Sequence, residues 1–148
     1  MAISEIPADP SSSLGSMNAR PQAWLAQACN DLDLAQLACR NGFLAQACYF
    51  ASQAAGKTLI SALLELGLEP PHTHVLGDLL TRLQAAGLET TAFQTLPLKA
   101  LSRMGITSRD PIDATPPADL FDRAETDQAI AVAAAVIAAI EALDRESP

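Results

Sequence analysis

The two histidines of the chain, His72 and His74, are its best candidates for acid–base chemistry near neutral pH. Both follow the pair Pro70-Pro71 and precede a helical pattern, so we expect Thr73 to cap a third helix and His74 to lie in its first turn. Two roles for His74 follow. Its ring either packs on the helical core and bonds a backbone group, or lines a cleft that takes a nucleotide or an acidic group of a partner. His72 is expected to face solvent.

Lys57 is the candidate partner of His74 in such a cleft, and it belongs to the strongest helical pattern of the chain, Phe43 to Leu66. Small and apolar residues with a 3.6-residue period predict one buried stripe. Its members are Leu44, Cys48, Ala51, Ala55, Leu59, Ala62 and Leu66. The opposite, polar side carries Gln46, Gln53, Lys57 and Ser61. Tyr49 and Phe50 flank the polar side, and we expect them to form a dimer or partner surface.

The segment Gln53 to Leu64, together with Gly67 and the later His74, resembles the second-helix signature of HEPN domains (higher eukaryotes and prokaryotes nucleotide-binding). That signature reads approximately QAAEKALKALL, then a glycine, then a histidine that opens the next helix. The resemblance implies a helical domain with a nucleotide-associated site. We take Gln53, Lys57 and His74 as candidate ligand-binding residues.

A second likeness lies in the segment from residue 105 to residue 111, GITSRDP, which resembles the family's loop of the form YIPSRYP. This loop makes Arg109 the fourth candidate ligand-binding residue. Alternatively, its guanidinium ties the loop to a helix end or to Asp113. The chain departs from the two family patterns at Gly56, Ile60, Gly105 and Asp110. Whether a family site survives these replacements is open at this point.

Length and composition predict one all-α domain, an up-and-down bundle of four or five helices. The 148 residues are enough for one core and too few for two domains, and aromatic residues make up only 4% of the chain. Residues 1–21 contain three prolines and few apolar residues, so we expect a flexible arm there. The HEPN-like bundle is expected over residues 22–145.

The helical patterns give the order of the elements. The expected helices are Gln22–Arg40, Phe43–Leu66, His74 to about Gln84 with Ala85-Ala86-Gly87 closing it, Leu96–Met104 and a final helix from Thr126 to Leu143. Asn41-Gly42 ends the first helix and predicts an antiparallel hairpin with the second. Asp31 is expected to point largely away from the core. The alanines of the final helix are expected to let it lie close to its neighbours.

Several kinds of chemistry are absent from the sequence. Some members of the resembled family are ribonucleases with an arginine followed by four to six residues and a histidine. Here the nearest arginine before the histidines is Arg40, so we expect no matched base and phosphate-binding cation. The chain has no GxSxG, HExxH, Walker or GxGxxG motif. Cys29, Cys39 and Cys48 lack metal-site spacing, so we expect no metal and no cofactor, with Cys39 and Cys48 as small core residues in a reducing compartment.

The net charge of −8, from 9 basic and 17 acidic residues, disfavours broad electrostatic binding to nucleic acid or to an anionic membrane. A nucleic-acid contact therefore needs a local basic patch, and we expect no DNA binding. We also expect no run of the roughly 18–20 apolar residues that span a membrane, and hence a cytoplasmic protein.

These observations predict a non-catalytic, homodimeric module that binds a nucleotide or RNA. The resemblance further implies a minimal nucleotidyltransferase as partner in a toxin–antitoxin-like pair. One alternative is a homodimeric scaffold in which the polar side of the second helix forms only a dimer seam. The other is a ribonuclease toxin in which His74 acts with Arg103 or Arg109.

Overall fold

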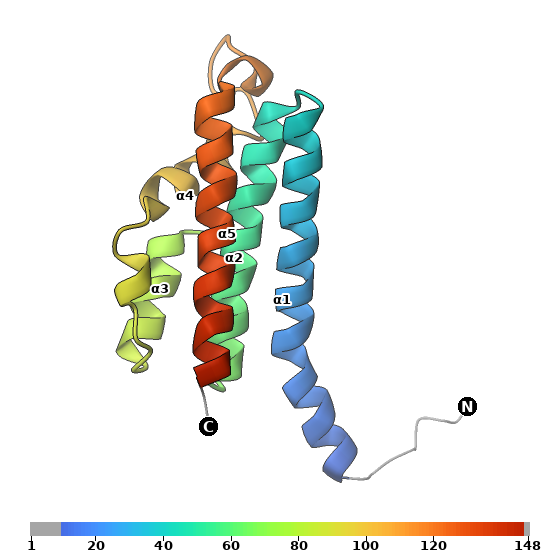
Figure 1. The fold of residues 1–148 in the computed structure, drawn as a ribbon, viewed down its shortest axis with the longest axis vertical. Coiled ribbons are helices and arrows are strands. Elements are labelled where there is room, and N and C mark those ends of the chain that lie inside the picture. Colours follow the sequence, from blue (N-terminus) through green and yellow to red (C-terminus); the bar gives the residue numbers. More distant parts are fainter. Residues whose placement is uncertain (1–9, 147–148) are drawn as a thin grey trace, which may run out of the picture.

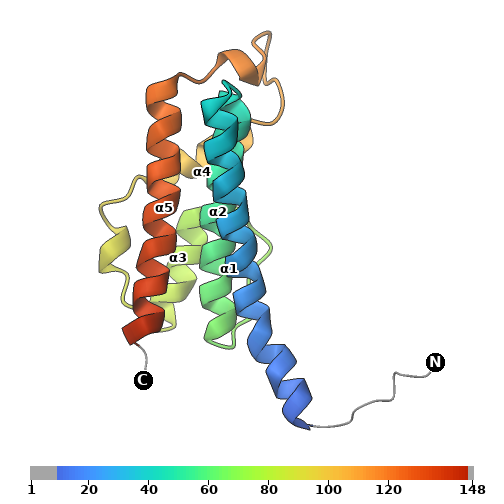
Figure 2. The ribbon, with the colours of Figure 1, turned by 45° about the vertical axis from the view of Figure 1, so that its right-hand side comes forward.

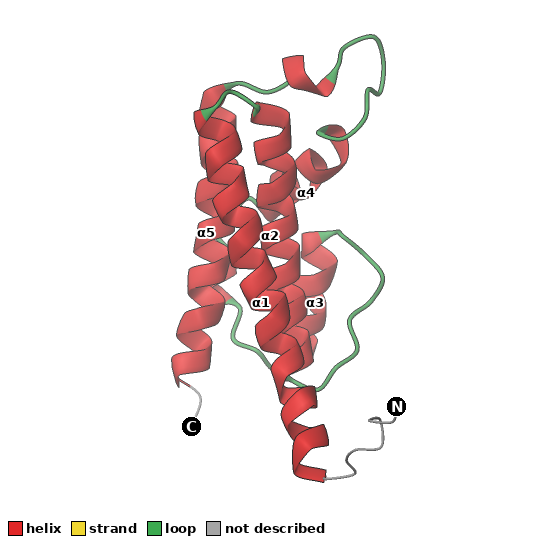
Figure 3. Cartoon of the chain, turned by 90° about the vertical axis from the view of Figure 1, so that its right-hand side faces the viewer, coloured by secondary structure: helices red, strands yellow, loops and turns green. Residues whose placement is uncertain are grey.

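The computed structural model describes residues 10–146, and within them all regular structure is helical (Figure 1). The α-helices are α1 (Pro10–Arg40), α2 (Leu44–Glu65), α3 (Leu76–Ala85), α4 (Leu98–Thr107) and α5 (Arg123–Glu146), with short 3-10 helices η2 (Thr91–Phe93) and η3 (Pro117–Asp119). Three long rods, α1, α2 and α5, run side by side, and the shorter α3 and α4 follow each other along α2 (Figures 2 and 3). The prediction of an all-α bundle is confirmed.

The chain direction of the rods follows from their connections. Helices α1 and α2 form the expected antiparallel hairpin, and the chain reverses between them at Gly42, which has a positive φ of 84°. The Gly42 N–H bonds the carbonyl of Cys39 at 3.1 Å, and the Phe43 N–H bonds that of Ala38 at 2.8 Å, as in a Schellman motif. The long connector between α4 and α5 then returns the chain to the end where α2 begins. Helices α2 and α5 therefore run in the same direction (Figure 1).

Helix α2 is the central element, since it contacts α1, α3, α4 and α5. Its buried side is rich in alanine, and α5 faces it with Ala129, Ala133 and Val136, all of them buried. Small side chains let helix axes approach closely. The predicted buried stripe is confirmed from Cys48 to Ala62, whereas Leu44 at its start is only partly buried and Leu66 at its end is 44% exposed. The helix has ended by then, and Gly67, with φ of 78°, turns the chain away.

Helix α1 begins at Pro10, twelve residues before the predicted start at Gln22. It continues through Pro21, whose buried carbonyl accepts a hydrogen bond from Ser61 Oγ of α2 at 2.8 Å. Ser61 is therefore buried, and its placement on an exposed polar side was wrong. Residues 1–9 of the predicted arm lie outside the described residues. The division into arm and bundle stays a prediction.

Two other helix starts differ from prediction. Helix α5 begins at Arg123 because Asp122 and Glu125 form a capping box: Asp122 Oδ1 accepts the Glu125 N–H at 2.8 Å, and Glu125 Oε1 accepts the Asp122 N–H at 2.9 Å. Helix α3 begins only at Leu76. Thr73 Oγ1 accepts the N–H of Val75 at 3.1 Å before the helix starts, so Thr73 is not its cap.

Helix α5 also bears on the question of a membrane span. Arg123–Arg145 is long and apolar enough to cross a membrane by length and composition, although its uninterrupted apolar run covers only residues 129–140. Several of its apolar side chains belong to the main core, among them Ala133, Val136 and Ile140. The buried apolar residues of α5 are therefore explained by packing in the bundle, while others, such as Ala131 and Ala138, are exposed.

The cysteines fit the prediction of core thiols at two positions. Cys39 and Cys48 are buried, and Cys29 is partly buried. Burial is the main cause that raises the pKa of each thiol above its ordinary value of 9.0. The three side chains are therefore protonated, small apolar groups at neutral pH.

Candidate functional site

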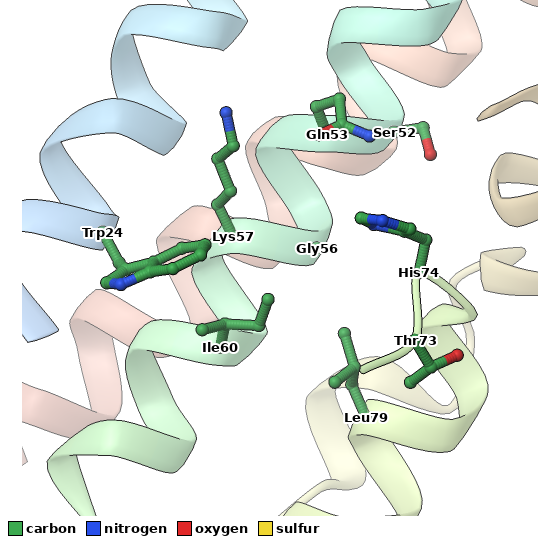
Figure 4. Close-up of a pocket in the computed structure, with 9 residues that line it drawn as sticks. All are labelled: Trp24, Ser52, Gln53, Gly56, Lys57, Ile60, Thr73, His74 and Leu79. Atoms are coloured by element: carbon green, nitrogen blue, oxygen red, sulfur yellow. The ribbon is translucent and has the colours of Figure 1, made fainter. Parts of the chain in front are cut away.

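The predicted site residues surround two adjoining pockets of about 130 Å³ each. The first, the Trp24 pocket, is lined by Trp24, Ser52, Gln53, Gly56, Lys57, Ile60, Thr73, His74 and Leu79 (Figure 4). The second, the Arg109 pocket, is lined by Tyr49, Ser52, Gln53, His74, Val75, Ser102, Gly105, Ile106 and Arg109. Ser52, Gln53 and His74 belong to both. The structure thus brings together Gln53, Lys57, His74 and Arg109, from α2 and two loops.

The Trp24 pocket has apolar walls and a polar edge. The indole of Trp24 comes from α1 and lies near Ile60, while His74 extends from the loop before α3 toward α2 (Figure 4). Gly56 lines the pocket between them. A flat aromatic wall beside an amide and an imidazole suits a planar heteroaromatic ring with polar edges. Trp24 was missed in the sequence because a lone tryptophan on a first helix has no distinguishing pattern.

The ammonium group of Lys57 is paired within the protein and is not free to bind a ligand. Its Nζ lies 2.6 Å from Oδ2 of Asp31, whose other oxygen accepts a hydrogen bond from Gln27 Nε2 at 2.9 Å. The Asp31 side chain is only 5% exposed, against 26% for Lys57, so the prediction that Asp31 points away from the core was wrong. Lys57 compensates the buried carboxylate and directs its amine away from His74 (Figure 4). It lines the pocket mainly with its methylene stem.

Arg109 supplies the free positive charge of the site. Among the described residues, the ion pairs within 4.0 Å are Arg20 with Glu69 and Lys57 with Asp31. Arg109 is exposed and has no partner there, and Asp113 instead accepts the N–H of Thr115 at 2.9 Å. The alternative in which Arg109 ties its loop to Asp113 is therefore not what the structure shows. A guanidinium left free in this way can bind a carboxylate or phosphate with two parallel hydrogen bonds.

His74 and Arg109 line the same pocket although they are far apart in the sequence, and the expectation that no histidine and cation are matched in this chain stays a prediction. His74 precedes α3 by two residues and is exposed, rather than lying in the first helical turn. Arg109 follows α4, and the end of α4 lies very close to α2. A Cβ added at Gly105 would overlap Ser52 Oγ and lie 3.1 Å from Ser52 Cβ. Glycine in place of the family's tyrosine thus permits the close approach of α4 to α2 at the pocket that Arg109 and His74 line.

Tyr49 and Phe50 serve two different surfaces. Their rings contact edge to face, with centroids 5.1 Å apart and planes at 83°. Tyr49 lines the Arg109 pocket, whereas Phe50 belongs to an apolar depression of about 350 Å³. The large side chains of this surface, the Phe43 patch, are Leu34, Leu37, Phe43 and Phe50. Leu34, Leu37 and Phe43 are 41%, 49% and 58% exposed. Leu34 and Leu37 lie one turn apart on the same exposed side of α1. This spacing could have predicted the patch from the sequence, and it was missed.

The bundle and its paired pockets can now be compared with known proteins. The family model described as HEPN domain matches residues 21–143. The chain therefore belongs to the HEPN family of helical modules associated with nucleotides and RNA. Among solved structures, it is similar to TT1696 from Thermus thermophilus, with 31% sequence identity and a TM-score of 0.69. The match covers 82% of this chain and 96% of that chain. A comparison with curated proteins finds no match.

Proposed function

We propose that the chain is a non-catalytic nucleotide-binding module that holds one nucleotide unit, free or at the end of an RNA. The base occupies the Trp24 pocket and the phosphate occupies the Arg109 pocket. The observation that carries this proposal is the sharing of Ser52, Gln53 and His74 by an apolar aromatic pocket and a pocket with an unpaired guanidinium. A nucleotide has the same two parts, joined by a short sugar.

The size of the pockets agrees with a small ligand. Each holds about 130 Å³, and typical small-molecule pockets begin at about 300 Å³. Both pockets together fall slightly below that size, so a nucleotide has to use both of them and keeps part of its surface in solvent. Stacking of a base on an aromatic side chain such as Trp24 contributes about 1–3 kcal/mol, and a phosphate on Arg109 adds charge-assisted hydrogen bonds.

Isothermal titration calorimetry with adenosine 5′-monophosphate tests the proposal. We expect saturable binding to the wild-type chain and at least a tenfold loss of affinity in the double variant His74→Ala, Arg109→Ala. Both side chains are exposed, so the variant should keep its fold. Arg40→Ala removes an exposed cation that lines neither pocket and should bind as the wild type does. Equal affinity in the double variant and the wild type would reject these residues as the site.

The ribonuclease alternative keeps one observation in its favour, the shared pocket of His74 and Arg109. In such a reaction His74 would take the proton of a ribose 2′-hydroxyl, whose oxygen would attack phosphorus and expel the 5′-oxygen, and the protonated imidazole would return a proton to that oxygen. Arg109 would bind the charged phosphoryl oxygens. We expect no cleavage of single-stranded RNA by the purified chain. Cleavage that leaves cyclic phosphate ends and is lost in His74→Ala would establish this alternative instead.

We further propose that two copies of the chain associate through the Phe43 patch. We also propose that the protein is cytoplasmic and that its partner is a minimal nucleotidyltransferase, with which it forms a toxin–antitoxin-like pair. The association of two copies is supported by the exposed apolar surface at the α1–α2 turn. None of the residues that line this surface lines the Trp24 pocket or the Arg109 pocket. Isologous dimers bury such patches against themselves. The scaffold alternative, in which the polar side of α2 is only a dimer seam, is less favoured because open pockets lie beside Lys57 and His74.

A further inference from the structure

Another depression lies between α3 and α4 and is larger than either of the two pockets of the candidate site, at about 490 Å³. Its lining residues are Val75, Gly77, Asp78, Thr81, Lys99, Ser102, Arg103 and Ile106. We call it the α3–α4 groove. Val75 and Ile106 are 44% and 61% exposed, so the groove presents apolar side chains to solvent without a covering element.

The α4 wall of this groove carries positive charge that has no internal partner. The chain has 17 acidic and 9 basic residues, yet residues 90–109 contain Lys99, Arg103 and Arg109 and no acid. Lys99 and Arg103 are four residues apart on α4, so they share one face. Neither forms an ion pair with any residue that the structure describes.

The position of Lys99 argues against a role in stabilising its own helix. It is the second residue of α4, where the helix dipole disfavours a cation. The opposite wall of the groove carries one acid, Asp78 in the first turn of α3. The groove thus has an apolar floor, a cationic rim along α4 and a single carboxylate on α3.

We propose that the α3–α4 groove docks an amphipathic acidic segment of a partner protein. Apolar side chains of that segment pack on Val75 and Ile106, and its carboxylates face Lys99 and Arg103. The residue of the docked segment that faces Asp78 must be neutral or basic, so Asp78 fixes the orientation of the segment in the groove. A nucleic-acid strand fits less well, because the groove lining has no aromatic side chain for base stacking and Asp78 repels phosphate.

Fluorescence anisotropy with a labelled synthetic helical peptide tests this docking. The peptide has leucine along one face and glutamate elsewhere. We expect it to bind with an affinity that falls as salt rises, and at least tenfold more weakly to Lys99→Glu, Arg103→Glu. The charge-matched variant Arg40→Glu, Arg145→Glu changes exposed cations outside the groove and should bind as the wild type does. The groove shares Val75, Ser102 and Ile106 with the Arg109 pocket, so the control that separates the two proposals is His74→Ala, Arg109→Ala, which should lose affinity for adenosine 5′-monophosphate and keep most of its affinity for the peptide.

Three outcomes would overturn the docking proposal. The first is a peptide that fails to bind, or that binds both double variants equally well. The second is a single-stranded RNA probe that binds through Lys99 and Arg103 while the peptide does not, which would make the groove a phosphate site. The third is a change in the oligomeric mass of the chain in Lys99→Glu, Arg103→Glu, which would make the groove an interface between copies.

Discussion

Lys57→Met should lower the free energy of unfolding by about 2–3 kcal/mol, or about 10 °C in Tm. Methionine keeps the length of the side chain and its contact with the Trp24 pocket but removes the charge. The carboxylate of Asp31, with a side chain only 5% exposed, then loses the ammonium 2.6 Å away and keeps only the hydrogen bond from Gln27. An uncompensated buried charge is costly because little water can reach it. Thermal and urea unfolding followed by circular dichroism measure the change.

The matched control removes both charges. Asp31→Asn with Lys57→Met leaves a neutral amide that Gln27 can still bond, so most of the lost stability should return. Asp31→Asn alone should cost less than Lys57→Met, because Lys57 is 26% exposed and can extend its amine into solvent. Equal instability of Lys57→Met and the double variant would show that the effect is not electrostatic.

Ala133→Leu should lower the free energy of unfolding by about 2–3 kcal/mol, the upper part of the range for an overpacked core. Ala133 is fully buried on α5 in the core cluster that α5 shares with α2, where Ala51, Ala54 and Ala55 are also fully buried. A leucine there must push the helices apart or adopt a strained rotamer. Urea unfolding gives the free energy, and the midpoint should fall with little change in the slope.

Ala131→Leu makes the same substitution on the exposed side of the same helix. Its stability should stay within about 0.5 kcal/mol of the wild type, because no neighbouring element has to move. A neutral Ala133→Leu would mean that α5 does not lie as close to α2 as the structure places it.

The parts of the fold that could be predicted from the sequence are those that depend on local sequence patterns. The 3.6-residue period of α2 and the Asn41-Gly42 stop predict the helical hairpin, and Phe43–Leu66 differs from α2 by only one residue at each end. Asp31 was misplaced because its burial depends on Lys57 of another helix, and no pattern within α1 records that compensation. The early start of α1 was missed because Pro10 and Pro21 were taken as helix breakers.

The candidate site was predicted only residue by residue. Gln53, Lys57, His74 and Arg109 were each chosen from the family resemblance, and the structure places them around two adjoining pockets. Their arrangement could not be predicted, since it depends on how α4 packs against α2 over the glycine at position 105. The same packing places His74 and Arg109 around one pocket, although they lie 35 residues apart in the sequence.

The fluorescence of Trp24 tests the proposed nucleotide site most directly, because it is the only tryptophan in the chain and it lines the pocket assigned to the base. Adenosine 5′-monophosphate should change the Trp24 emission saturably, and the change should disappear in His74→Ala, Arg109→Ala although the indole wall of the base pocket is intact. Emission that does not respond while calorimetry detects binding, or a response that persists in the double variant, would contradict the assignment of base and phosphate to these two pockets.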